Sequence, residues 1–322
     1  MLTRLVPILL LLTAAACGGS SSAATGGRTQ TPVNLTLDWY PNADHVGVYT
    51  AIDHGFFARA GLDVTARPPS AASDSITLVA SGRSDIGISY EPEVFFAQQE
   101  HIPVVAVAAV VPRALASIIA AGGSGIRTPA DLRGKTIGID GTASTTAFVD
   151  TVLRHSGVDP SEVKLVNVGF NQVPELLQHK VDAVAGVFQN IEGIQFAQQG
   201  LHPVVFPYDR YGVPQYDELV LVANANKLHA DADYRRTVAR FVTALAAATR
   251  WAQAHPKAAI AVMERNAYRD YQGTIRASVP ATLDLLRTAP LNAQAWARFG
   301  DWMYSSGLLK RRPDAAALVA RP

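Results

Sequence analysis

Four short segments combine aromatic side chains with amide or carboxylate groups, the residue types that hold a flat heterocyclic ring. The segments are DWYPNADH (38–45), ISYEPE (88–93), GVFQNIE (186–192) and YGVPQYDE (211–218). Aromatic faces stack on such a ring and a few polar groups orient it, so an uncharged or weakly cationic heterocycle fits best. The alternative is ordinary loop chemistry, because Pro and Asn end strands and aromatic rings cover sheet edges. The candidate ligand-binding residues are Trp39, Asn42, Tyr90, Glu91, Phe188, Asn190, Glu192 and Tyr216.

A further candidate is the turn in GKTIGIDGTASTT (134–146), which is typical of a strand, a tight turn at Gly141 and a helix start. Backbone N–H groups at a helix N-terminus favour an anion or an acceptor atom, and ligands of such sheets lie at the carboxyl ends of strands. The alternative is a well-capped helix with Thr142 or Ser144 as N-cap. Gly141 is therefore a candidate ligand contact, with both interpretations open.

The elements that position these segments alternate between short β-rich runs and longer helical runs. Strands are expected at 35–40, 62–67, 85–90 and 103–111, with helices near 43–60, 71–82 and 92–100. A second set has strands at 117–121, 135–140, 164–169, 182–188 and 203–208, and a helix at 145–157. Such alternation predicts an α/β fold with parallel sheet and helices on both faces.

After a strand expected at 218–224 the chain becomes helical, with runs at 231–256, 257–269, 280–288 and 292–306. If that strand returns to the first sheet, the chain crosses twice between two lobes. The sequence thus predicts a hinge and an inter-lobe ligand cleft. We expect lobe 1 to contain 33–113 plus 217–322 and lobe 2 to contain 114–216.

Composition narrows the functional classes. The chain has 322 residues, is 48% hydrophobic, and carries a net charge of +1 with one Cys. This near-neutral charge gives no sign of nucleic-acid binding, and one Cys excludes a disulfide framework and Cys-based metal sites. No phosphate loop, Gly-x-Gly-x-x-Gly or His-Glu-x-x-His motif occurs. We therefore expect no catalytic residues, no metal and no cofactor, and we expect a monomer.

The amino terminus is typical of an export signal. In residues 1–17, Arg4 precedes an apolar run that is too short to span a membrane, and small residues precede Cys17. We expect a lipoprotein signal peptide at 1–17, lipid attachment at Cys17 and a flexible tether at 18–32. The mature protein would then be extracytoplasmic and lipid-anchored to the membrane. The alternative is an ordinary secretory signal with an incidental Cys17.

Longer runs around the aromatic segments resemble the bacterial solute-binding proteins for thiamine pyrimidine precursors. That family belongs to a wider group with the sulfonate-binding proteins and the fungal hydroxymethylpyrimidine-phosphate synthase. The resemblance spans roughly 33–260 and is carried by DWYPN (38–42), KLVNVGFN (164–171) and YGVPQYDELVLV (211–222). RTPADLRGKTIG (127–138) is shared by the wider group.

The resemblance implies a periplasmic-binding-protein-like fold (type II), with a pyrimidine held between the lobes and delivered to an ABC permease. It also implies pocket roles for Trp39, Asn42, Tyr90, Phe188 and Glu192. Glu192 is the expected partner of the ring's amino group, because a carboxylate accepts hydrogen bonds strongly from an exocyclic amine.

Two departures from the family pattern keep other functions open. FQNIE (188–192) lacks the family's usual His, and GTASTT (141–146) replaces a more proline-rich turn. A riboflavin-like heterocycle is one alternative ligand. A sulfonate or nitrate is another, and it would need a helix N-terminus or basic residues such as Arg113 and Arg210 in the cleft. A pyrimidine synthase is the enzyme alternative; such relatives carry a Cys-rich iron-binding segment, whereas the only Cys here is Cys17.

Overall fold

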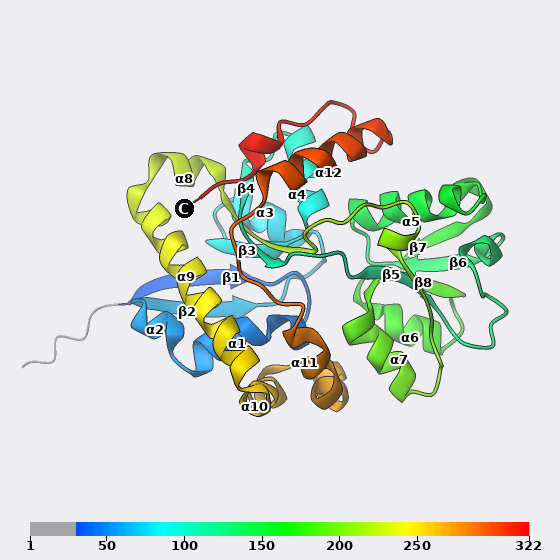
Figure 1. Ribbon diagram of the computed structural model, residues 1–322, viewed down its shortest axis with the longest axis horizontal. Helices are drawn as coiled ribbons and strands as arrows, with labels where there is room; N and C mark the ends of the chain where they lie inside the picture. The colour runs from blue at the N-terminus through cyan, green and yellow to red at the C-terminus, as the bar shows by residue number, and fades with distance from the viewer. Residues whose placement is uncertain (1–29, 322) are drawn as a thin grey trace, which may run out of the picture.

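The computed structural model describes residues 30–321, which form two α/β lobes (Figure 1). The lobes are joined by two crossing segments, the first over 112–115 and the second over 211–218. The expected signal peptide, Cys17 and most of the tether lie outside the described residues. The last two residues of the expected tether belong to the first strand instead, because β1 (Thr31–Thr36) begins at Thr31 and pairs there with Leu62. Among residues 30–321, no helix combines the length and the apolar character needed to cross a membrane.

Lobe 1 is built on a five-stranded sheet in the order β2-β1-β3-β10-β4. Its other strands are β2 (Leu62–Arg67), β3 (Ile86–Ser89), β4 (Val104–Val111) and β10 (Leu219–Asn224). β1 is parallel to β2 and β3, but β10 is antiparallel to β3 and β4. The prediction of parallel sheet was wrong for β10, because this strand enters from lobe 2 and so runs in the opposite direction.

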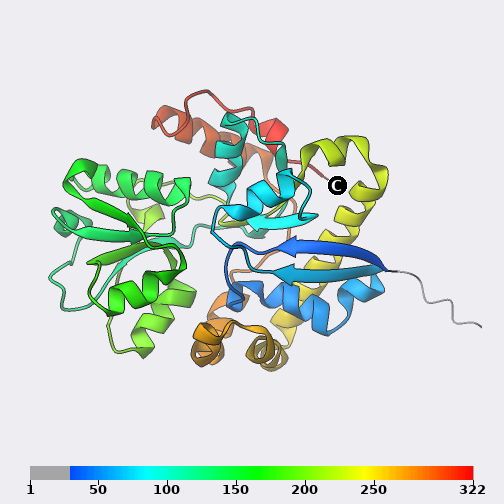
Figure 2. The same ribbon diagram turned by 180° about the vertical axis from the view of Figure 1, so that it is seen from behind.

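Lobe 1 is covered by helices from both ends of the chain (Figures 1 and 2). The early ones are η1 (Ala43–His45), α1 (Val46–Asp53), α2 (Phe56–Arg59), α3 (Asp74–Ala80) and α4 (Glu91–Gln99). The late ones are α8 (Ala225–Ala230), α9 (Ala232–Ala254), α10 (Pro256–Asn266), η7 (Arg269–Thr274), α11 (Ile275–Leu283), α12 (Ala293–Ser305) and η8 (Ala315–Leu318). Asp231 caps α9 by accepting from two backbone N–H groups, and α9 buries Phe241 against Phe57 at 4.7 Å between ring centroids.

Lobe 2 repeats the architecture with a sheet in the order β7-β6-β8-β5-β9. Its strands are β5 (Ala116–Ala120), β6 (Thr136–Ile139), β7 (Lys164–Asn167), β8 (Ala183–Phe188) and β9 (Val204–Pro207). Its helices are η2 (Pro129–Leu132), α5 (Ala143–His155), η3 (Pro160–Glu162), η4 (Gly169–Asn171), α6 (Gln172–Leu177), η5 (Gln189–Gly193), α7 (Ile194–Gln198) and η6 (Tyr208–Arg210). This sheet is also mixed, because β5 is antiparallel to both neighbours.

One carboxylate fastens the two crossing segments together. Glu218, just before β10, accepts hydrogen bonds from the backbone N–H groups of Leu115 (2.6 Å) and Ala116 (2.8 Å), where the chain enters β5. The two sheets with their covering helices confirm the two-lobe α/β fold predicted from the sequence. We propose that the lobes divide at 113/114 and 216/217, at this junction.

The first aromatic segment lies in a different element from the one predicted. A strand was expected over 35–40, but β1 ends at Thr36, where its pairing with β2 stops. Trp39 and Tyr40 therefore follow the strand as a loop that leads into η1. This places their rings at the carboxyl end of the sheet, facing lobe 2, as the contacts below show.

Gly141 is fixed by the geometry of its turn, which gives a prediction about stability. Its φ is +86°, and a Cβ there would lie 2.5 Å from Asn167 Nδ2. Gly141→Ala is therefore expected to lower the free energy of unfolding by about 1–3 kcal/mol, measured by urea denaturation. Gly157→Ala is the matched control, because Gly157 has a similar φ of +74° with nothing within 4 Å of its Cβ position. Equal losses of unfolding free energy in the two variants would show that the close approach of the new Cβ to Asn167 does not destabilise the protein.

Candidate functional site

The lobes meet around a small buried cavity whose lining comes from both of them. Lobe 1 contributes Tyr90 and Pro92, the second crossing segment contributes Tyr216 and Glu218, and lobe 2 contributes Ala116, Asp140, Thr142, Ser144, Thr145, Phe148, Gly186, Phe188 and Tyr208. The free volume is about 10 Å³, which is room for one water molecule. A ring-sized ligand can therefore enter only when the lobes separate.

An open groove of about 700 Å³ lies beside this cavity and shares Asp140 with it. Its walls are aromatic on both sides: Tyr40 stacks on Tyr268 at 4.2 Å between ring centroids, and Phe170 of lobe 2 lies 4.8 Å from Tyr40. Phe170 also meets Trp39 edge-to-face at 4.3 Å. Aromatic side chains of the two lobes thus contact one another where the groove leads inward.

Behind the groove, three buried side chains form a hydrogen-bonded chain across the lobes. Trp39 Nε1 donates to the hydroxyl of Tyr271 (2.7 Å), and that hydroxyl donates to Glu192 Oε1 (3.2 Å). Glu192 Oε2 accepts from the backbone N–H of Phe188 (3.0 Å). Lobe 1 supplies Trp39 and Tyr271, whereas Glu192 and Phe188 belong to lobe 2, so the chain exists only when the lobes are closed.

A second buried network holds Tyr90. Its hydroxyl donates to Asp38 Oδ2 (3.1 Å), and Asp38 Oδ1 pairs with His45 Nε2 at 2.9 Å. His45 Nδ1 accepts from the backbone N–H of Asn42 (3.2 Å), so the ring proton sits on Nε2 and points to Asp38. The Asn42 side chain accepts from Asp44 N (2.8 Å) and caps η1. Asn42 therefore orients the network from behind and does not line the cavity.

The turn around Gly141 caps a helix and places two of its residues in the cavity lining. Thr142 caps α5 by accepting from Thr145 N, and Asp140 accepts from Thr142 N (2.9 Å) and from Thr145 Oγ1 (3.1 Å). Asp140 and Thr142 also line the cavity. The N-terminal N–H of Ser144 already has a partner, because it donates to the carboxyl oxygen Oε1 of Glu93 in lobe 1 at 2.9 Å. The helix N-terminus is thus occupied by the protein's own carboxyl group.

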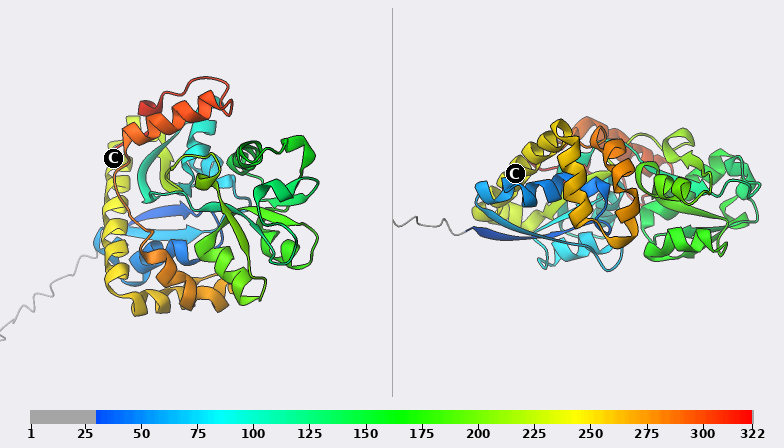
Figure 3. Two further views of the ribbon diagram at one scale, coloured as in Figure 1. Left: turned by 45° about the vertical axis from the view of Figure 1, so that its right-hand side comes forward. Right: turned by 90° about the horizontal axis from the view of Figure 1, so that it is seen from below.

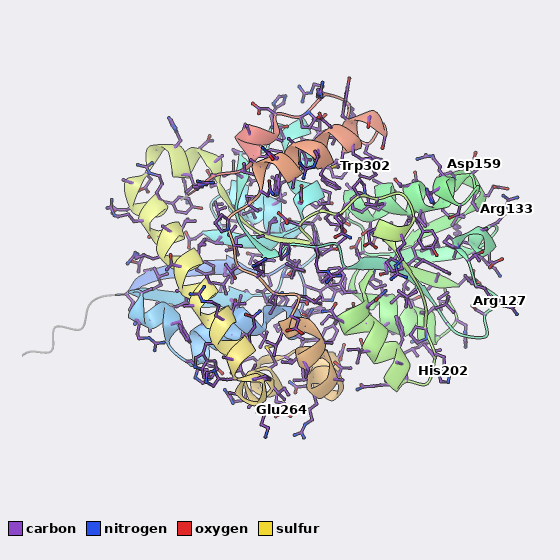
Figure 4. The ribbon with its side chains drawn as sticks, in the orientation of Figure 1. Arg127, Arg133, Asp159, His202, Glu264 and Trp302 are labelled. Atoms are coloured by element: carbon purple, nitrogen blue, oxygen red, sulfur yellow. The ribbon has the colours of Figure 1, made fainter. Side chains whose placement is uncertain are left out.

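The cleft is rich in carboxyl groups. Burial raises the pKa of Glu192 and of Glu218 to about 7, and it also raises the pKa of Asp140. Among the described residues that line the inner cavity there is no Lys or Arg. Figure 4 shows the labelled Arg127 and Arg133 at the outer edge of lobe 2, away from lobe 1. The inner cavity therefore favours a ligand group that donates hydrogen bonds or carries positive charge.

Two predicted site residues lie outside the cavity, Asn190 at an inter-lobe contact and Glu91 at a contact with the second crossing segment. Asn190 donates from Nδ2 to Asp44 Oδ1 (2.8 Å) and to Thr282 Oγ1 (2.9 Å), both in lobe 1. Glu91 accepts from the backbone N–H of Asp217 (2.6 Å) in the second crossing segment. Of the other predicted site residues, Tyr90, Phe188 and Tyr216 line the cavity, and Gly141 lies between two lining residues. Trp39 and Glu192 belong to the hydrogen-bonded chain through Tyr271.

The sequence analysis missed several residues of this site: Asp38, Asp140, Tyr208, Glu218 and Tyr271. For Asp38 and Asp140 a signal was present, because each follows a strand at its carboxyl end, where ligands of α/β sheets bind. Tyr271 gave no such signal, since it lies in the helical tail. Its segment reaches the cleft because Tyr268 N donates to Pro41 O (2.8 Å).

The Asn190 contacts give a prediction about lobe closure. Asn190→Ala leaves buried Asp44 without its amide donor and removes two bonds between the lobes. We expect a larger radius of gyration for the unliganded protein by small-angle X-ray scattering, and a loss of about 1–3 kcal/mol of stability. Gln178→Ala, at an exposed position of lobe 2, is the control that should change neither quantity. An unchanged radius of gyration for Asn190→Ala would mean that these bonds do not hold the lobes together.

Comparison with known proteins gives a family match and relatives that span most of the chain. Residues 42–259 match the model of the NMT1/THI5-like family. A Haemophilus influenzae protein named for thiamine biosynthesis is 32% identical over 289 residues, covering 89% of this chain and 90% of that protein. The formylaminopyrimidine-binding protein of Halalkalibacterium halodurans is 36% identical over 236 residues, covering 73% of this chain and 70% of that protein.

Among solved structures, the alkanesulfonate-binding protein SsuA of Xanthomonas axonopodis pv. citri, bound to MOPS, superposes with a TM-score of 0.74. It is 19% identical in sequence, and the match covers 91% of this chain and 99% of that one. At this identity the likeness shows the fold, and it confirms the predicted periplasmic-binding-protein architecture.

Proposed function

The chain belongs to the NMT1/THI5-like family, and from this premise we propose that it is the substrate-binding protein of an ABC importer, with an aminopyrimidine precursor of thiamine as its ligand. The formylaminopyrimidine-binding relative supports this ligand class. The fold that the chain shares with a substrate-binding protein supports the mode of binding, between two lobes.

The observation that carries the proposal is the buried Glu192 carboxyl group at the contact between the lobes. It lies in hydrogen-bonding contact with Tyr271, which also holds the Trp39 indole. A carboxylate among aromatic faces matches an amino-substituted flat ring, since the ring stacks and its amine donates. The absence of Lys and Arg among the described residues of the cavity lining agrees with a ligand without negative charge.

Binding works by lobe closure. Ligand contacts contributed by both lobes exist together only in the closed arrangement, so the ligand shifts the equilibrium toward it. Glu218 ties the crossing segments to each other and gives the lobes a common hinge. The closed protein would then present a surface that the open one lacks, which is how an ABC permease could read the bound state.

The alternative ligands differ in charge and size. A sulfonate or nitrate would meet the buried carboxyl groups, and Arg113 and Arg210 lie in a separate recess beside Asn190. A riboflavin-like ligand would need the outer groove as well as the inner cavity. The enzyme alternative is a pyrimidine synthase, which would make a pyrimidine from a different reactant. Our proposal is instead that the protein binds a pyrimidine and releases it unchanged.

We also propose that the protein works outside the cytoplasm, attached to the membrane by lipid on Cys17. The order of Arg4, an apolar run and Cys17 supports this location. Mass spectrometry of the membrane-extracted protein tests it: an acylated N-terminal Cys17 is expected, and a processed chain without lipid would contradict it.

A thermal-shift panel on the protein beginning at residue 18 tests the ligand. The panel contains aminopyrimidines, thiamine, riboflavin and alkylsulfonates. An aminopyrimidine at 100 times its dissociation constant should add about 2.7 kcal/mol of stability, and it should be recovered chemically unchanged. A shift with a sulfonate and none with any pyrimidine would overturn the proposal, and so would chemical conversion of the pyrimidine.

A further inference from the structure

Tyr271 lies in a segment that touches both lobes. Its helix η7 lies beyond residues 42–259, the range that matches the family model. The segment is tied to lobe 1 by the bond from Tyr268 N to Pro41 O, and to lobe 2 by the bond from Gln195 Nε2 to Asp270 O (3.1 Å). Figure 3 shows the helices around η7 (orange) beside the helices of lobe 2 (green), and η7 packs against α7.

The hydrogen-bond chain through Tyr271 has only one possible direction. The Trp39 indole N–H is a donor only, so the Tyr271 hydroxyl oxygen accepts from it. The single hydroxyl proton of Tyr271 must then point to its other partner, Glu192 Oε1. Trp39 therefore orients Tyr271, and Tyr271 in turn presents a fixed donor to the carboxyl group of the opposite lobe.

We propose that Tyr271 is the positioning residue of the binding site: on lobe closure its hydroxyl donates to the Glu192 carboxyl group, which favours the ionised form and orients it to accept from the amino group of the ligand. This inference rests on the proposed function. Tyr271 acts through Glu192 and need not touch the ligand itself. One Glu192 oxygen is held by Tyr271 and the other by Phe188 N, and each oxygen keeps a further lone pair for a ligand amine.

The electrostatics explain why a donor is needed at this place. Burial raises the pKa of Glu192, and the charge of Asp38 raises it further, whereas the bonds from Phe188 N and Tyr271 lower it. Asp44 on η1 also interacts electrostatically with Glu192. Tyr271 is the one side-chain donor on Glu192 among the described residues. Without it, closure would favour a protonated carboxyl group that accepts an amine less well.

The test is Tyr271→Phe, which removes the hydroxyl and keeps the ring. Tyr234→Phe is the matched control, because Tyr234 is a buried tyrosine whose hydroxyl bonds to Asp85 O, away from the cleft. In the unliganded protein, the Glu192 carboxyl group is titrated by carbon-13 NMR and assigned with Glu192→Gln. Tyr271→Phe should raise the pKa of Glu192 and Tyr234→Phe should not. Affinity for 4-amino-5-hydroxymethyl-2-methylpyrimidine at pH 7 should fall about 10-fold or more in Tyr271→Phe alone.

The two measurements separate failure of this inference from failure of the proposed function. An unchanged Glu192 titration in Tyr271→Phe overturns the inference, whether or not the pyrimidine binds. If the wild-type protein binds no aminopyrimidine, the ligand proposal and the ligand role of Tyr271 both fail, even if the titration shifts. Should Tyr271→Phe not fold, Trp39→Phe removes the N–H that orients Tyr271, and it should raise the same pKa by a smaller amount.

Discussion

Replacing Glu192 with Gln is expected to weaken aminopyrimidine binding by about 10- to 100-fold, the loss for one hydrogen bond to a charged group. The same change should make the unliganded protein more stable at about pH 8. A Gln keeps one amide oxygen that can accept from Phe188 N. Its NH2 group cannot accept from the Tyr271 hydroxyl, but the side chain carries no buried charge, and removal of that charge is the larger effect at this pH. Calorimetric titration with 4-amino-5-hydroxymethyl-2-methylpyrimidine measures the first effect, and urea denaturation measures the second.

Glu175→Gln is the matched control for this prediction. Glu175 lies in the same lobe but pairs with Lys180 at the surface (3.0 Å), so its loss should change neither quantity appreciably. Unchanged affinity in Glu192→Gln would remove Glu192 from the binding site. A loss of stability at pH 8 would show instead that its charge is needed for folding.

The second large effect is a fall in the stability of the unliganded protein as the pH rises. Glu192 and Glu218 have pKa values of about 7 in the folded protein, against 4.5 as the ordinary value. A raised carboxyl pKa means that the folded state binds more protons, so the stabilisation is complete below about pH 4.5 and is lost as the pH rises through 7. Each group costs about 3 kcal/mol at pH 8 relative to its protonated form.

Other buried carboxyl groups act in the same direction, since burial raises the pKa of Asp44, Glu91, Glu93 and Asp140. Urea denaturation of the protein at about pH 5.5, 7 and 8.5 should therefore show decreasing stability. Glu192→Gln should flatten that profile, and Glu175→Gln should leave it unchanged. A profile that rises with pH in the wild-type protein would contradict the buried, proton-binding state of these groups.

The layout of the fold could be predicted from the sequence because each strand is a short apolar run and each turn carries its own signal. The apolar run at 218–224 predicted the strand that is β10, and the Asp start and Pro end predicted the helix at 231–256. The direction of β10 could not be predicted, because an apolar run of this kind reads the same in a parallel or an antiparallel pair. The end of β1 at Thr36 is set by its pairing with β2. This pairing is a tertiary contact, so the local sequence does not predict where the strand ends.

The part of the site that lies at strand ends could be predicted from the sequence. Residues beside strand ends, such as Tyr90, Phe188 and Tyr216, reach the cavity because strand ends converge there. Asn190 sits in the same run as Glu192, yet its amide is used to bind Asp44. Which of the two neighbouring polar residues bonds to Tyr271 and which to Asp44 depends on the helical geometry of η5. Tyr271 lies about 80 residues from Glu192 in sequence, so no local pattern connects them.

The hydrogen bonds that Glu218 accepts from the backbone N–H groups of Leu115 and Ala116 show that both ends of lobe 2 lie at the same place. β4 and β10, which flank lobe 2 in sequence, are neighbours in the sheet of lobe 1, with Leu219 opposite Val111. Lobe 2 is therefore an insertion in the tip of a β-hairpin. A short turn in its place would close lobe 1 into an uninterrupted sheet. The molecule is modular at this junction, and recombination could exchange the half of the cleft that carries Glu192 without disturbing the half that carries Trp39.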